Sequence, residues 1–383
     1  MFTDVVDRAD APVLQGRGRA GLLQVAGEAL GQELRGGLVE ARAAVGEAFP
    51  EIEVHEVLRG ERILDPSREP VELRARDILL VKATAADLEN AARHFRQALA
   101  IQPDFFEAEK ALADMQILYQ QMNGLPPSHG LEEQRRFLEM VIARDPGSAD
   151  ALAARGTIAW LHDWDLEKAA GYFARSRALD PRGGNVGYAQ FLNIIGHHQE
   201  ALAEMKRAVR SDPLNPFLLA NLGARYFFAG DREAAIRTHK DLLEMEPGFW
   251  ISLWLLGYIE SADGNPQAAI PHLTEAAENS QMPAVVLPNL AQALVAAGRR
   301  GEAEDILADL VAQSRERYVA PTYLACIQAA LGHDDEAFAA LEQGIRDRDW
   351  NLFWIRKIYD CETYLADDPR WPETVGKIGL PEW

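Results

Sequence analysis

Small side chains that recur every 34 residues are the feature that most constrains the fold of this chain. One row consists of alanines, at Ala201, Ala235, Ala269, Ala303 and Ala337. A second row consists of glycines five positions earlier, at Gly196, Gly230, Gly264, Gly298 and Gly332. A third small residue stands seven positions before each glycine, at Ala189, Gly223, Gly257, Ala291 and Ala325. Three rows in fixed phase over five periods indicate one structural unit that is repeated.

Each row has a physical role in a helical hairpin. A glycine can end a helix in the left-handed conformation, which costs a residue without Cβ nothing. The other two rows suit the point where two antiparallel helices cross, because a larger side chain would push the backbones apart. Apolar residues between the rows have helical spacing, as in Leu218, Leu222 and Tyr226. Pro213 and Pro247 fall where the second helix of a unit would end. The predicted unit is helix, short turn, helix.

The stretch NLGARYFFAGDREAAIRTHKDLLEMEP (221–247) resembles the tetratricopeptide repeat (TPR) consensus. ARGTIAWLHDWDLEKAAGYFARSRALDP fits with one extra residue in its turn, and AARHFRQALAIQP resembles the second helix of a further unit. The resemblance implies a mostly α fold, a TPR α-solenoid of about seven full repeats plus a half repeat over residues 87–349. The segment 104–146 is degenerate, with a longer loop at 124–130.

Residues 350–383 leave the 34-residue period. We expect them to form a C-terminal cap with a short helix at 369–378, because the last repeat of a solenoid otherwise exposes a core face. Together with the DWD insertion at 163–165, the DDPRW ending is similar to TPR arrays of bacterial signalling proteins that follow winged-helix or adenylate-cyclase-type domains. Those domains have no counterpart here, so neither a transcriptional nor a cyclase activity is inferred.

Residues 1–86 have a different pattern, with strands expected at 52–58 and 78–81 and a helix at 30–45. VHEVLRGERILDPSREPVELRARDILLVKATAADLE resembles the C-terminal regulatory domain of potassium-uptake regulators (TrkA-C, or RCK C-terminal) over residues 34–88. The resemblance implies a small α/β module that dimerises and can bind a small ligand. Arg76 and Ala83 stand where that family usually has glycine, and no ligand residue is transferred. The predicted domains are 1–86, 87–349 and 350–383.

The charge of the chain limits its partners. The 59 acidic side chains outnumber the 39 Lys and Arg, which gives a net charge of −20. Such a surface repels phosphate backbones, so we expect no nucleic-acid binding and a neutral or basic protein or peptide partner.

Membrane insertion and secretion are not expected either. No window approaches the ~20 apolar residues of a membrane span, and the N-terminus lacks the apolar core of a signal peptide. Cys326 and Cys361 are the only cysteines, 35 positions apart, and we expect two unlinked buried side chains. A cytoplasmic location follows from these expectations.

The sequence contains only weak candidates for nucleotide binding, metal binding or catalysis. Gly16, Gly18 and Gly21 spell GxGxxG, which would bind a nucleotide only if a helix began near Leu22; a flexible loop is the favoured interpretation. His197 and the residue after it are expected in a solvated turn, because adjacent histidines point in different directions. No catalytic residues, cofactor site or metal site are predicted, and the chain is not expected to be an enzyme.

In TPR superhelices the first helix of each unit lines the concave groove. The groove positions of this chain are Asp150, Thr157, Trp160, Gln190, Asn193, Phe217, Asn221, Phe227, Phe228, Ile251, Trp254, Tyr258, Asn289 and Gln292. Phe228, Trp254 and Tyr258 would be rigid anchors for a partner, although large aromatic side chains at helical spacing are more often core residues. The carboxylate clamp of chaperone-binding arrays is not matched, because Val186, Ile251 and Leu255 occupy its polar positions. Chaperone-tail binding is therefore not expected.

The sequence thus predicts a non-enzymatic scaffold or adaptor that binds a peptide or helix of a partner in the groove. The N-terminal module would dimerise it or tie it to a transporter. An alternative is a regulatory protein whose N-terminal module senses a small molecule or ion while the array relays the signal. A third interpretation is a piece of a longer, membrane-associated protein.

Overall fold

The structure is a computed structural model. It describes residues 22–26, 53–59, 62–64, 78–82, five positions between 93 and 100, 126–128, 130–280 and 282–380. The chain divides into two compact units, one of residues 1–123 with 130–140 and one of residues 124–129 with 141–383. The second unit contains the described repeats.

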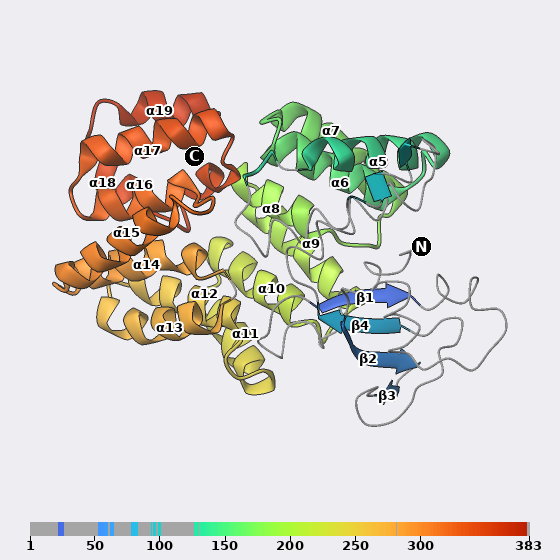
Figure 1. Ribbon diagram of the computed structural model, residues 1–383, viewed down its shortest axis with the longest axis horizontal. Helices are drawn as coiled ribbons and strands as arrows, with labels where there is room; N and C mark the ends of the chain where they lie inside the picture. Colours follow the sequence, from blue (N-terminus) through green and yellow to red (C-terminus); the bar gives the residue numbers. More distant parts are fainter. Residues whose placement is uncertain are drawn as a thin grey trace. The chain divides into compact units, whose positions relative to one another are not determined.

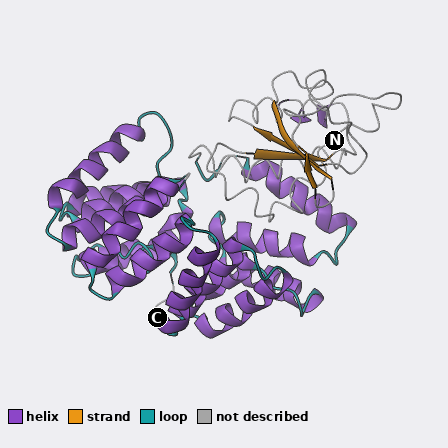
Figure 2. Ribbon diagram, turned by 90° about the horizontal axis from the view of Figure 1, so that it is seen from below, coloured by secondary structure: helices purple, strands orange, loops and turns teal. Residues whose placement is uncertain are grey.

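Within the described residues, six antiparallel helical hairpins follow one another along the second unit (Figures 1 and 2). A preceding helix, α5, spans Leu131–Arg144. The first helices of the hairpins are α6 (Ala149–Leu161), α8 (Val186–Ile194), α10 (Pro216–Phe228), α12 (Trp250–Ala262), α14 (Pro283–Ala296) and α16 (Pro321–Ala330). The second helices are α7 (Leu166–Leu179), α9 (His198–Ser211), α11 (Arg232–Met245), α13 (Pro266–Asn279), α15 (Arg300–Gln313) and α17 (Asp334–Asp347). The predicted repeat is confirmed over these residues, and most of 87–130 lies outside the described part.

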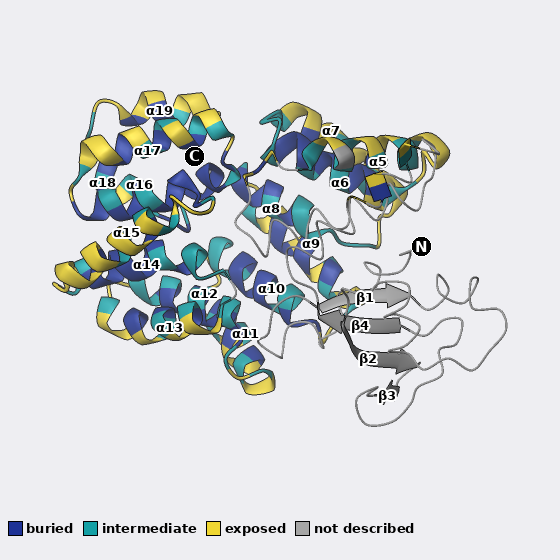
Figure 3. Ribbon diagram, in the orientation of Figure 1, coloured by how far each residue is buried: buried dark blue, intermediate teal, exposed yellow. Residues whose placement is uncertain are grey.

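The three rows of small residues act as the sequence predicts. The five glycines have φ between 71° and 87°, so each one turns the chain in the left-handed region between the two helices of a hairpin. All five alanines of the first row are fully buried. Buried and exposed positions alternate along the helices of the repeats (Figure 3). At two glycines of the third row the neighbour is close enough to exclude a side chain. A Cβ on Gly223 would lie 2.5 Å from Nε2 of His239, and one on Gly257 would lie 2.6 Å from Cγ of Leu273.

Local signals explain where the helices begin. Side chains of Ser148, Asp165, Asn185, Asn215 and Asp231 accept hydrogen bonds from backbone N–H groups in the first turns of α6 to α8, α10 and α11. Proline occupies the first position of α10, α13, α14 and α16, where its missing N–H is not needed.

After the last hairpin the chain forms a 3₁₀ helix, η2 (Trp350–Trp354), and two short helices, α18 (Glu362–Leu365) and α19 (Trp371–Ile378). The helix predicted at 369–378 is confirmed by α19. Trp371 and Ile378 are buried in the same hydrophobic cluster as Trp160 and Phe173 of the first hairpin. This cluster therefore joins the first described hairpin to the C-terminal part of the unit.

The first unit contains a four-stranded antiparallel sheet in the order β1-β4-β2-β3. Its strands are β1 (Leu22–Ala26), β2 (Glu53–Arg59), β3 (Arg62–Leu64) and β4 (Ile78–Lys82). The two predicted strands coincide with β2 and β4, whereas the helix predicted at 30–45 lies outside the described residues. A strand and not a helix begins at Leu22, so the helix that nucleotide binding by the GxGxxG sequence requires is not formed.

Candidate functional site

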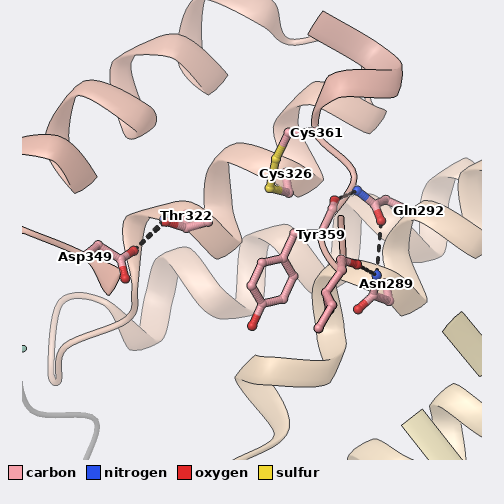
Figure 4. Close-up of a disulfide and its surroundings, with 8 residues drawn as sticks. Asn289, Gln292, Thr322, Cys326, Asp349, Tyr359 and Cys361 are labelled. Carbon is pink, nitrogen blue, oxygen red and sulfur yellow. Dashed lines mark hydrogen bonds between the residues drawn. A yellow bond between two sulfur atoms is a disulfide. The ribbon is translucent and has the colours of Figure 1, made fainter. Parts of the chain in front are cut away.

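The candidate site is the inner face of the array, which we define as the surface made by the first helices α6, α8, α10, α12, α14 and α16. Residues 350–361, here called the C-terminal segment, lie against this face (Figure 4). The segment lies outside the repeats, and its contacts show what the inner face can bind.

Three successive backbone carbonyls of the C-terminal segment accept hydrogen bonds from inner-face side chains. The hydroxyl of Tyr258 donates to the carbonyl of Lys357 at 3.1 Å. Nδ2 of Asn289 donates to the carbonyl of residue 358 at 2.6 Å, and Nε2 of Gln292 donates to that of Tyr359 at 2.5 Å. These donors come from α12 and α14, so adjacent repeats together hold a turn of the backbone.

Aromatic side chains hold the same segment at two further places. The ring of Phe353 lies edge-on to Trp160 at 5.9 Å and to Trp164 at 5.6 Å. The ring of Tyr359 lies 6.5 Å from Trp254 and 5.4 Å from a tyrosine of α16. Contacts with α6, α12 and α16 therefore extend the binding surface along the inner face.

A buried polar network fixes the start of the segment to α16. Oδ2 of Asp349 accepts hydrogen bonds from the backbone N–H and the hydroxyl of Thr322, the latter at 2.6 Å (Figure 4). Oδ1 accepts two more from Asn351. Burial raises the pKa of the Asp349 carboxyl, and the four hydrogen bonds oppose that rise. Asp349 thus caps η2 and joins it to α16.

A disulfide between Cys326 of α16 and Cys361 closes the end of the segment (Figure 4). Both cysteines are fully buried, as expected, but the expectation that they are unlinked is wrong. Their Cα atoms lie 5.1 Å apart because the segment folds back along α16, a proximity that local spacing does not reveal. The cytoplasmic location rested partly on unlinked cysteines and loses that support.

The structure brings one group of predicted groove residues against the protein's own C-terminal segment. We expected a partner at these positions, and the segment occupies them instead: Trp160, Trp254, Tyr258, Asn289 and Gln292. Trp254 also donates to Oδ1 of Asn289 at 2.8 Å, so the two side chains support one another. Burial is the main cause that raises the pKa of the Tyr258 hydroxyl, consistent with its role as a donor.

The remaining predicted residues lie on α6, α8, α10 and α12. Asn193 and Asn221 are buried, Asp150 is exposed, and the others are half-buried: Thr157, Gln190, Phe217, Phe227, Phe228 and Ile251. Nε2 of Gln190 donates to Oδ1 of Asn221 at 3.4 Å, which links α8 to α10. Whether these residues bind a partner stays a prediction.

Two residues of this region were missed or misjudged from the sequence. His198 does not lie in a solvated turn; its Nδ1 is 2.9 Å from Oδ1 of Asn193 and its ring stacks on Phe228 at 6.3 Å. Arg225 is buried, with its guanidinium over the ring of Phe228 at 5.6 Å. The sequence did offer a signal for Arg225, because it is the one charged residue in the otherwise mostly apolar helix α10.

Among the residues that the structure describes, no three His, Cys, Asp or Glu side chains are grouped as metal ligands would be. No described helix is both long and apolar enough to cross a membrane.

Comparison with known proteins identifies the repeats. Two family models, both described as tetratricopeptide repeat, match residues 220–283 and 261–321. The chain therefore contains TPR repeats, as the sequence predicted. No curated protein matches the chain. These comparisons do not support the resemblance of residues 34–88 to potassium-uptake regulators or that of the array to signalling proteins.

Several solved structures are similar in part. The APC/C hetero-tetramer Cut9–Hcn1 is 19% identical over 68% of this chain and 50% of its own, with a TM-score of 0.46. Yeast Tom70 is 15% identical over 76% of this chain and 62% of its own, with a TM-score of 0.46. PilW, a type IV pilus biogenesis factor, is 16% identical over 61% of this chain and 98% of its own, with a TM-score of 0.40. This chain thus spans half the length of the Cut9–Hcn1 chain that it matches.

Proposed function

We propose that this chain is a protein-interaction scaffold, not an enzyme, and that its inner face binds a peptide or helix of a partner protein. The observation that carries the proposal is the set of hydrogen bonds from Tyr258, Asn289 and Gln292 to three successive carbonyls. Backbone carbonyls are common to all peptides, so a surface that binds them suits a peptide segment, while neighbouring aromatic side chains provide selectivity.

The partner would bind on the part of the inner face between α6 and the three hydrogen-bond donors. The hydrogen bonds and ring contacts of the C-terminal segment described above go to α6, α12, α14 and α16. The proposed partner surface lies on α8, α10 and the start of α12, and consists of Gln190, Asn193, Phe217, Asn221, Phe227, Phe228 and Ile251. A net charge of −20 favours a partner segment that is neutral or basic overall.

A displayed library of random peptides tests the proposal and does not require the partner to be identified first. We expect selection on the oxidised full chain to enrich binding peptides. Their affinity should fall at least tenfold for a Phe217→Ala/Asn221→Ala double variant, a loss of about 1.4 kcal/mol of binding free energy. Lys240→Ala is the matched control, because Lys240 is exposed on the second helix α11. Equal binding by the double variant and the control would refute the location, and absence of any enriched peptide would refute peptide binding.

Three finer statements rest on sequence alone. We propose that residues 1–86 are a TrkA-C-like module through which the chain forms a homodimer, which light scattering on the full chain tests. We keep 1–86, 87–349 and 350–383 as the proposed domains. The cytoplasmic location also stays a prediction, and the fraction of linked cysteines in protein trapped rapidly from cells measures how oxidising the compartment is.

A further inference from the structure

A buried arginine without a carboxylate is the feature that leads beyond the proposed function. Arg225 is 3% exposed, and its Nε and Nη1 atoms have no hydrogen-bond partner. Burial alone lowers the pKa of its guanidinium to about 10, with no contribution from a carboxylate. The chain pairs other cations: Arg177 and Arg207 both form ion pairs with the buried Glu204. The bare guanidinium at Arg225 is therefore a local exception in a chain rich in acidic residues.

Leaving a charge buried and unpaired lowers the stability of a fold. The ring of Phe228, 5.6 Å from the guanidinium, compensates only in part, because a cation–π contact does not replace hydrogen bonds from Nε and Nη1. An anion that accepts those hydrogen bonds would remove the penalty. A carboxylate is the natural match for the fork of an arginine.

Asn193 supplies a second donor in the same place. It is fully buried, and its Nδ2 has no hydrogen-bond partner. Its Oδ1 is held by Nδ1 of His198 at 2.9 Å, which orients the amide so that Nδ2 points away from that histidine. The ring of His198 stacks on Phe228, the same ring that Arg225 covers, so the residues form one cluster between α8 and α10.

The surrounding charges favour an anion at this cluster. After burial itself, the charges of Lys357 and Arg225 are the largest causes that lower the pKa of His198, which places both cations within electrostatic range of it. Lys357 is positioned by the hydrogen bond from Tyr258 to its carbonyl. Lys357 therefore adds positive charge at the edge of the cluster, and the nearby carboxylates of Asp360 and Glu362 offset part of it.

We propose that Arg225 and Asn193 form a subsite of the inner face that binds the carboxylate of an aspartate or glutamate side chain in the partner peptide. The subsite rests on the proposed function in that the carboxylate belongs to a bound peptide. It differs from the clamp that the sequence excluded, because Val186, Ile251 and Leu255 hold the clamp positions and Arg225 occupies another position on its helix. A partner segment with one acidic side chain would match the positive charge of Arg225. If the rest of the segment is neutral or basic, it would also match the net negative charge of the chain.

Binding of a carboxylate is tested directly on the full oxidised chain by NMR of the arginine Nε–Hε groups. The probe is aspartate blocked as N-acetyl-aspartyl-methylamide, and blocked asparagine is its neutral match. We expect the Arg225 signal, assigned by its loss in Arg225→Lys, to shift saturably with the aspartate probe only. Asn193→Ala should weaken this binding about tenfold, and the exposed Arg237 should show no saturable shift. An Arg225 signal that does not respond, or that responds equally to both probes, overturns the subsite.

Stability supplies a second, independent test. Replacing an unpaired buried charge by an apolar side chain of similar length should stabilise the chain without ligand. We expect Arg225→Met to raise the melting midpoint by about 2–4 °C while abolishing the response to the aspartate probe. A lowered midpoint would show that Arg225 serves the fold and would contradict the subsite.

The two proposals fail separately. If library peptides bind and the blocked aspartate does not, the subsite is wrong and the scaffold stands. If the blocked aspartate shifts Arg225 but no peptide is enriched, the anion site is real and peptide binding is wrong.

Discussion

Removing the disulfide between Cys326 and Cys361 tests how the inner face is kept closed. The bond joins α16 to the end of the C-terminal segment, whose carbonyls at residues 357–359 are bound by α12 and α14. Without the disulfide, the folded state keeps its hydrogen bonds and ring contacts. The unfolded chain, however, gains conformational freedom. Alanine is the suitable replacement at both positions, because both sulfurs are buried and a serine hydroxyl would need a partner.

The expected loss of stability follows from the length of the loop. The two cysteines are 35 residues apart, and closing a loop of this length removes an entropy equivalent to about 4 kcal/mol at 25 °C. A domain of 150–250 residues loses roughly 2–4 °C of melting midpoint for each kcal/mol. Cys326→Ala/Cys361→Ala should therefore melt roughly 8–16 °C below the oxidised chain.

Thermal unfolding followed by far-ultraviolet circular dichroism measures this difference. Adding a thiol reductant to the wild-type chain should give nearly the same decrease, and the same reductant should leave the double variant unchanged. A variant that melts within about 2 °C of the oxidised wild type would refute the reasoning. So would two free thiols in the denatured wild type before reduction.

Three further predictions concern the repeats and the inner face. Gly257→Ala should destabilise the chain by about 1–3 kcal/mol, because the new Cβ would lie 2.6 Å from Leu273. Gly301→Ala should stabilise it by about 0.5–1 kcal/mol, since no atom lies within 4 Å of that Cβ; urea unfolding measures both, and equal effects would contradict the packing explanation. Burial lowers the pKa of His239 to about 4 from its ordinary 6.5, so the folded state loses up to about 3 kcal/mol as the pH falls from 6.5 to 4. Urea unfolding at several pH values measures the free energy of unfolding of the wild type and of His239→Gln. The difference between the two should change with pH below 7 and become constant above it. Tyr258→Phe removes one donor to the C-terminal segment and should cost about 1 kcal/mol while accelerating amide hydrogen exchange at residues 355–361; unchanged exchange there would contradict the role of this hydroxyl.

The repeated part of the fold was predictable because each position of the period performs one local task. A glycine at the turn needs a left-handed backbone, and a small residue at the helix crossing needs space. Both requirements depend only on neighbours within one hairpin, so Gly230 and Ala235 show the same signal as their counterparts in other repeats.

The closure of the inner face was not predictable in this way. Residues 350–361 lie outside the period, so their place on α12, α14 and α16 depends on contacts between positions far apart in the chain. The bond from Asn289 joins residues 69 positions apart, and that from Tyr258 joins residues 99 positions apart. No pattern within a repeat contains that information. The disulfide was missed for the same reason.

Groove positions identify a surface, but they do not identify its occupant. The downstream half of the inner face uses its donors on the chain's own backbone, as Asn289 and Gln292 do. In the upstream half, Asn193 and Arg225 keep buried donors without an acceptor. Buried donors are almost always satisfied in stable proteins, so each such donor calls for a physical explanation. The chain's own carbonyls accept hydrogen bonds from Tyr258, Asn289 and Gln292, and an acceptor from another molecule could do the same for Asn193 and Arg225.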